Sequence, residues 1–330
     1  MTGGFMPVAA LATSLVTLDA PSNAQAPPTL TPSDGPITLT RDAIGQPRFK
    51  AGVDLVTLDV CVRDATGRFL TDLTPDDFLV LEDGKPQRPS FVLPSGTLPL
   101  RAVLLIDRSA SMSGAKLTRA VEAAALFARR LEPDDTLGII TFNQQAARIH
   151  AFGDDPLRAV TSLGSLTATG STSLYDALLV AANDLARARN DALPDTGAAV
   201  IVLSDGEDTA SRVGFEEVLP VRRRTGALVY SISLRTNEKG AGLGATWPLL
   251  AMARDTGGRA LSVPNLSALP GLYAEIDAEV RHLYRIGYVS TDERLDGRWR
   301  NVSVRVISRE ARVRARAGYY AAGRRKGSFQ

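Results

Sequence analysis

Cysteine and histidine are nearly absent from this chain of 330 residues, which contains one cysteine and two histidines. Cys61 cannot form an internal disulfide bond, and no histidine lies near it in the sequence to activate it as a nucleophile. The apolar, alternating residues around Cys61 predict that it is a small buried hydrophobic residue. His150 and His282 alone do not supply the ligands of an ordinary zinc site.

Neither sign of charge dominates the chain, whose formal net charge is +2. Hydrophobic residues make up 44% and charged residues 22% of the sequence. These values do not indicate a disordered chain or a nucleic-acid-binding protein. The length is sufficient for one large domain, or for one large and one smaller domain.

Long hydrophobic runs are also missing, and we expect no transmembrane segment in the mature chain. Residues 5–18 are apolar or small but too few to span a bilayer, which is typical of an export signal. We predict a signal peptide over 1–24, cleaved before Gln25, and a periplasmic, cell-surface or secreted protein. Because no Lys or Arg precedes the apolar residues, a misplaced start codon or an uncleaved tail on a cytoplasmic protein remains the alternative. Residues 25–47 have the composition of a linker, and 322–330 form a tail.

The middle of the chain alternates between strand and helix patterns. Residues 102–106 and 198–203 are continuous apolar runs, as in strands covered on both faces. Helical spacing of apolar residues follows at 117–131 and 174–188. Further strands are expected at 136–142, 147–152, 227–234 and 259–263, and further helices near 214–222, 246–255 and 267–283. This order predicts a doubly wound, mostly parallel α/β sheet over 97–283.

Short strand patterns lie on both sides of this region, in 48–96 and in 284–321. Strands are expected from 53 and from 78 in the first segment, and at 283–289, 300–307 and 311–319 in the second. A β unit of roughly 45 residues is marginal by itself. We therefore predict that both segments pack together in one small β-sandwich, into which the α/β domain is inserted.

Three loops carry the candidate functional residues. Asp107-Arg108-Ser109-Ala110-Ser111 follows the first buried strand, and Ser204-Asp205-Gly206 follows the second. Gly170-Ser171-Thr172 opens the helix at 174. Since the carboxyl ends of parallel strands line one edge of the sheet, where ligands bind, the three loops are expected to meet there.

The side chains of these loops suit a hard cation, because Asp, Ser and Thr supply only oxygen ligands. Mg²⁺ is the expected metal, with Mn²⁺ or Ca²⁺ as alternatives. Two carboxylates and three neutral hydroxyls would leave the cation under-neutralised, so the site should accept an anionic oxygen from a partner's Asp or Glu. Asp107, Ser109 and Ser111 converge if the first loop starts out extended, since alternate residues then point the same way.

The three loops together resemble those of the von Willebrand factor type A domain. The resemblance implies a metal-ion-dependent adhesion site, with Asp107, Ser109 and Ser111 in its first loop, Thr172 in its second and Asp205 in its third. It also implies that an acidic residue of a partner protein completes the metal shell. Leu73-Thr74-Pro75-Asp76-Asp77-Phe78 and Ala317-Gly318-Tyr319-Tyr320 are similar to motifs of exported bacterial proteins with a central type A domain. The resemblance spans residues 48–321.

Two other functions are alternatives to this protein-binding, non-enzymatic interpretation. A phosphatase of the haloacid-dehalogenase type also places an Asp after its first buried strand, but usually has a second Asp two residues later. Here that position is Ser109, which lacks the acid/base function. The other alternative is a structural scaffold without a functional metal.

Three further sequence features do not support a catalytic site. No Gly-x-Ser-x-Gly motif indicates a serine hydrolase. The glycine-rich residues 240–244 lack the strand–loop–helix setting of a nucleotide-binding loop. Asp176, Glu207 and Asp208 are interpreted as a solvated rim or as helix-start charges rather than ligands.

Overall fold

The computed structural model describes residues 40–41, 47–48, 55–94, 96, 99–188, 197–218, 226–234 and 247–321. The predicted signal peptide 1–24, nearly all of the linker 25–47, the glycine-rich residues 240–244 and the tail 322–330 lie outside the described residues. The chain divides into a unit over 1–49 and a unit over 50–330. In the first unit, β1 (Thr40–Arg41) pairs with β2 (Pro47–Arg48) in antiparallel fashion.

A six-stranded sheet forms the centre of the α/β region, in the order β12-β11-β10-β7-β8-β9. Its strands are β7 (Leu100–Asp107), β8 (Thr136–Phe142), β9 (Ala146–His150), β10 (Gly197–Ser204), β11 (Leu228–Ser233) and β12 (Ala260–Ser262). Neighbouring strands run parallel except β9, which is antiparallel to β8. Residues 102–106 of β7 have no exposed surface, because both faces of the sheet are covered. This explains their continuous apolar run.

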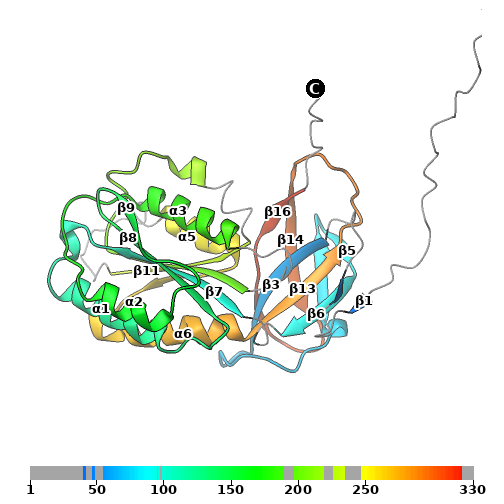
Figure 1. The fold of residues 1–330 in the computed structure, drawn as a ribbon. Coiled ribbons are helices and arrows are strands. Elements are labelled where there is room, and N and C mark those ends of the chain that lie inside the picture. Colours follow the sequence, from blue (N-terminus) through cyan, green and yellow to red (C-terminus); the bar gives the residue numbers. More distant parts are fainter. Residues whose placement is uncertain are drawn as a thin grey trace, which may run out of the picture. The chain divides into compact units, whose positions relative to one another are not determined.

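Helices cover both faces of this sheet (Figure 1). On one face lie α1 (Ala115–Ala128), α2 (Pro156–Leu163) and α6 (Leu269–Arg281), which pack against Leu104 and Ile106 of β7. On the other face lie α3 (Leu174–Arg187) and α5 (Trp247–Thr256), which share a core with Val103 and Leu105. Residues 215–218 are also helical. Helix α2, which has only about two turns, was not predicted from the sequence.

Two four-stranded antiparallel sheets form the β-sandwich, in the orders β15-β3-β13-β6 and β16-β14-β4-β5. Their strands are β3 (Leu55–Arg63), β4 (Phe78–Glu82), β5 (Lys85–Gln87), β6 (Pro89–Pro94), β13 (Leu283–Val289), β14 (Trp299–Val306), β15 (Arg312–Arg314) and β16 (Gly318–Tyr320). Each sheet combines strands from before and after the α/β region. Leu58, Val80, Ile286 and Val304 lie in their common core. The predicted fold class is therefore confirmed.

The end of the chain differs from the prediction of a single strand over 311–319. The structure has two strands there, β15 and β16, and they belong to different sheets. Residues between them cross from one sheet to the other close to Gly257, where an added Cβ would lie 2.9 Å from the backbone nitrogen of Arg316. Strands β5 and β6 were not predicted either, because Pro86 and Pro89 interrupt the strand pattern.

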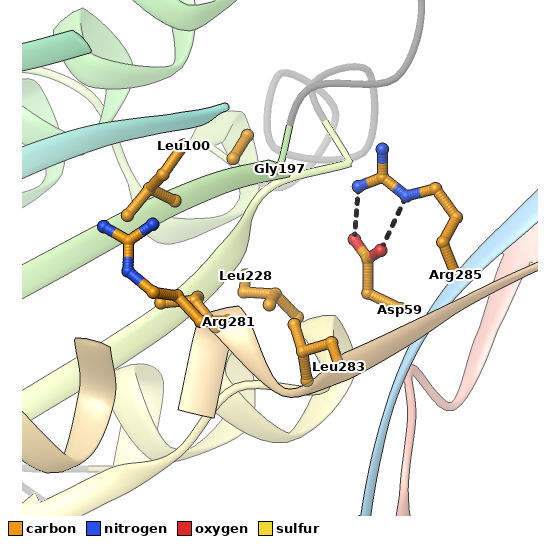
Figure 2. Close-up of a pocket in the computed structure, with 9 residues that line it drawn as sticks. Asp59, Leu100, Gly197, Leu228, Arg281, Leu283 and Arg285 are labelled. Atoms are coloured by element: carbon orange, nitrogen blue, oxygen red, sulfur yellow. Dashed lines mark hydrogen bonds and ion pairs between the residues drawn. The ribbon is translucent and has the colours of Figure 1, made fainter. Parts of the chain in front are cut away.

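The sandwich and the α/β region are joined covalently at two points, between β6 and β7 and between α6 and β13, and the junction is closely packed. Helix α6 leads into β13 through His282 alone. In Figure 2, the start of β7 at Leu100 and the start of β10 at Gly197 face the ion pair between Asp59 and Arg285. Arg285 Nε donates to Asp59 Oδ1 at 2.9 Å. The cavity among these residues measures about 10 Å³, which is at the limit for one water molecule.

Among the helices that the structure describes, none combines the length and the apolar character that crossing a membrane requires.

Candidate metal site at the carboxyl edge of the sheet

Asp107 ends β7, and its side chain has no exposed surface. The backbone N–H of Ser109 donates to Asp107 Oδ1 at 2.8 Å, and the Ser204 hydroxyl donates to Oδ2 at 2.5 Å. Both carboxylate oxygens are therefore held by donors from the ends of two neighbouring strands. The carboxylate is fixed in position where β7 and β10 end.

The first loop turns sharply after Ser109. Ser109 is extended, with φ −62° and ψ 166°, and Ala110–Met112 form a 3₁₀ turn. This turn brings the Ser111 hydroxyl to 3.1 Å from the Ser109 hydroxyl. The expected alternation thus ends at Ser109, and the tight turn rather than an extended backbone brings the two hydroxyls together. Met112, with no exposed surface, anchors the turn in the core.

Thr172 lies in the second loop and is 5% exposed. Its backbone is tied to the segment after Asp205: the Thr172 N–H donates to Thr209 Oγ1 at 3.0 Å, and its carbonyl accepts from the N–H groups of Thr209 and Ala210. A Cβ added to Gly206 would lie 3.6 Å from Thr172 Oγ1. The Thr172 hydroxyl is therefore beside the third loop.

Asp205 follows β10 and links the third loop to the first. The Ser111 hydroxyl donates to Asp205 Oδ1 at 2.7 Å. The ammonium group of Lys116, in the first turn of α1, forms an ion pair with Asp205 Oδ2. The carboxylate is 2% exposed and the Lys116 side chain 32%, so the lysine reaches the site from its open side.

The five predicted ligands thus gather at the edge where β7 and β10 end. Burial raises the pKa of Asp107 above its ordinary value, and the neighbouring Asp205 carboxylate raises it further, although hydrogen bonds from Ser204 and Ser109 act in the opposite direction. A cation between the two carboxylates would offset both effects. The donor set consists of oxygen atoms only and fits a hard cation such as Mg²⁺. In the part of the chain that the structure describes, no three His, Cys, Asp or Glu residues cluster as metal ligands.

Residues 102–207, which include all five of these positions, match the model of the von Willebrand factor type A domain. This chain contains a von Willebrand factor type A domain. Domains of this family commonly mediate protein–protein interactions.

The type A domain is similar to regions of two mammalian proteins. It is 30% identical over 120 residues to human inter-alpha-trypsin inhibitor heavy chain H4, and 27% identical over 131 residues to the mouse heavy chain H2. These matches cover 34% and 37% of this chain but only 13% and 14% of the relatives. The likeness therefore concerns this domain and not the whole proteins.

Two solved structures are also similar. A von Willebrand factor type A protein from Catenulispora acidiphila has a TM-score of 0.49 at 11% identity, covering 83% of this chain and 76% of that chain. The von Willebrand factor domain of the type V pili tip protein Mfa5 from Porphyromonas gingivalis has a TM-score of 0.46 at 12% identity, covering 55% and 94%. With TM-scores below 0.5, neither adds to the assignment.

Two residues at the edge of the type A domain were not predicted as part of the site. Ser204 holds Asp107, and Lys116 pairs with Asp205. Ser204 directly precedes Asp205 and resembles an ordinary strand-end residue. A signal for Lys116 was available, because a cation in the first turn of a helix opposes the helix dipole and therefore suggests an acidic partner.

The acidic residues around the site have the contacts of structural carboxylates. Asp208 accepts a hydrogen bond from the backbone N–H of Tyr175, at the start of α3, at 3.0 Å. Asp176 accepts from the N–H of Arg212 at 3.1 Å. These hydrogen bonds join the start of α3 to the loop after Asp205, so they stabilise the second and third loops relative to each other.

Proposed function

We propose that the type A domain binds Mg²⁺ through Asp107, Ser109, Ser111, Thr172 and Asp205, and uses the bound ion to bind another protein. An Asp or Glu carboxylate of that protein would complete the metal shell. The observation that carries the proposal is the convergence of two buried carboxylates and three hydroxyls from three loops at one edge of the sheet.

The preference for an acidic partner follows from the charges around the site. Two carboxylates balance the charge of a divalent cation, so, contrary to the expectation from the sequence, they do not by themselves leave it under-neutralised. Lys116 adds one positive charge beside Asp205. With Mg²⁺ bound, the group of ion, two carboxylates and ammonium carries a net charge of +1, which attracts an anionic ligand.

The residues at the site support a binding function over hydrolysis. Ser109 stands where a phosphatase of the haloacid-dehalogenase type usually has its acid/base carboxylate. Among the described contacts of Ser109 and Ser111 there is no hydrogen bond to a histidine, which a serine nucleophile would need as its base. The apolar residues 5–18 support export, in which case the partner would be periplasmic, on the cell surface or extracellular.

Calorimetric titration of Mg²⁺ into the EDTA-treated, dialysed full chain tests this proposal. We expect saturable heat from one site, also with Mn²⁺, and we expect immobilised protein to capture partners from an envelope extract in Mg²⁺ and release them in EDTA. The absence of metal-dependent heat in the wild type would overturn the proposal. If the protein hydrolysed a phosphate ester in Mg²⁺ and the Asp107→Asn variant lost this activity, the phosphatase function would replace the proposed binding function.

Lys116→Gln is expected to bind Mg²⁺ at least about tenfold more tightly than the wild type, because the ammonium repels the cation across a few ångströms in a partly buried site. The same titration measures the change. Lys85→Gln removes an equal charge from an exposed position in the sandwich and should leave the affinity unchanged. Weaker binding by Lys116→Gln would instead mean that the lysine supports the metal site.

A further inference from the structure

A second cavity, of about 260 Å³, lies away from the metal loops. Four arginines line it: Arg63 of β3, Arg312 and Arg314 of β15, and Arg259. Arg259 directly precedes β12, so the cavity is on the side of the sheet where strands begin, whereas the metal loops follow strand ends. A single water needs only about 10–15 Å³ by the same measure, so this cavity has room for a small organic or inorganic ligand.

Glu279 forms ion pairs with three of these arginines. Its carboxylate has no exposed surface and accepts hydrogen bonds from Arg63, Arg259 and Arg314. Glu275, which is 38% exposed, adds a second carboxylate paired with Arg259. Four guanidinium groups against two carboxylates leave this cluster with a net charge of +2.

Arg312 is the arginine that this network does not explain. Its side chain is exposed and forms no hydrogen bond or ion pair with any residue that the structure describes. In the register of β15 and β3, Arg312 lies directly opposite Arg63. Like charges directly opposite each other across two strands are destabilising, and Glu279 offsets the charge of Arg63 but not that of Arg312, so an anion beside Arg312 would relieve the repulsion.

We propose that this cavity binds a small, multiply charged oxyanion, a phosphate compound or a polycarboxylate, with Arg312 as its principal ligand and Arg259 as the second. Guanidinium groups match the oxygens of phosphate and carboxylate with paired N–H donors. Arg259 reaches the two glutamates through Nη1 alone, so its other N–H groups are available to a ligand. The lining offers no activated nucleophile, because burial raises the pKa of the Cys61 thiol, so the site would bind its ligand without transforming it.

Thermal unfolding of the full chain in EDTA tests the proposal while the metal site is kept free of ions. Pyrophosphate and citrate serve as probes, each compared with sodium chloride at equal ionic strength. We expect at least one of them, at millimolar concentration, to raise the Tm of the wild type by about 3 °C or more. Citrate alone would indicate a polycarboxylate ligand, and pyrophosphate alone a phosphate compound.

Two variants separate the cavity from non-specific anion binding. Arg312→Gln should lose the response and keep its fold, since Arg312 holds no other residue. Arg305→Gln removes the same charge from an exposed position of β14 that also lacks an ion pair among the described residues, and it should respond like the wild type. No shift with either probe, or an equal shift in Arg312→Gln and the wild type, would overturn the proposal.

Discussion

Asp205→Asn is expected to bind Mg²⁺ at least about a hundredfold more weakly than the wild type, because it replaces one of two carboxylates by a neutral amide. The substitution keeps the size of the side chain and leaves an oxygen that can still accept from Ser111. It also leaves the Lys116 ammonium without its carboxylate, and this unpaired charge repels an incoming cation. Titration calorimetry on both proteins gives the affinity ratio.

Glu207→Gln is the matched control for this experiment. Glu207 lies two residues further along the same loop and is exposed, so this variant loses one nearby negative charge without losing a predicted ligand. Its affinity should remain within about threefold of the wild type, because charges exposed to solvent are screened. If both variants weaken binding equally, the general negative charge of this edge binds the ion, rather than coordination by Asp205.

Much of this edge was predictable because its signals are local. Asp107 directly follows a continuous apolar run and Asp205 follows another after Ser204, and such runs become buried parallel strands whose carboxyl ends share one edge. Asp107 and Asp205 were therefore brought together by the sheet register alone, in which Ile106 is paired with Leu203. The alternation of strands and helices predicted the doubly wound fold for the same reason.

The features that were missed depend on contacts between distant residues. The partner of Asp205, Lys116, is 89 positions away, and only the folded loops show the pairing. The exchange of sheets between β15 and β16 occurs where the backbone of Ala315 and Arg316 packs beside Gly257. A glutamate in a helix is ordinarily expected on the solvated face, so the sequence did not indicate that Glu279 of α6 is buried. Its burial depends on arginines from β3, from β15 and from the residue before β12, which are distant in the sequence.

The same buried carboxylate leads to the second large expected effect. Glu279→Gln is expected to lower the free energy of unfolding by about 3–5 kcal/mol, the usual cost of removing one partner from a buried ionic network. Glu279 accepts from Arg63 at 3.2 Å and from the hydroxyl of Tyr230 at 2.7 Å, in addition to Arg259 and Arg314. Burial, with Glu279 adding to it, raises the pKa of Tyr230 well above its ordinary value, so the tyrosine remains a neutral donor.

Urea denaturation at neutral pH, followed by circular dichroism, measures this loss. Glu275→Gln is the control, because Glu275 lies one helical turn away, is 38% exposed and pairs with Arg259, so its loss should cost less than about 1 kcal/mol. Equal stability of the two variants would mean that the arginines around Glu279 find water or other acceptors when its charge is removed. A large difference would mean that this carboxylate joins α6 to strands β3 and β15, and thereby holds the type A domain to the sandwich.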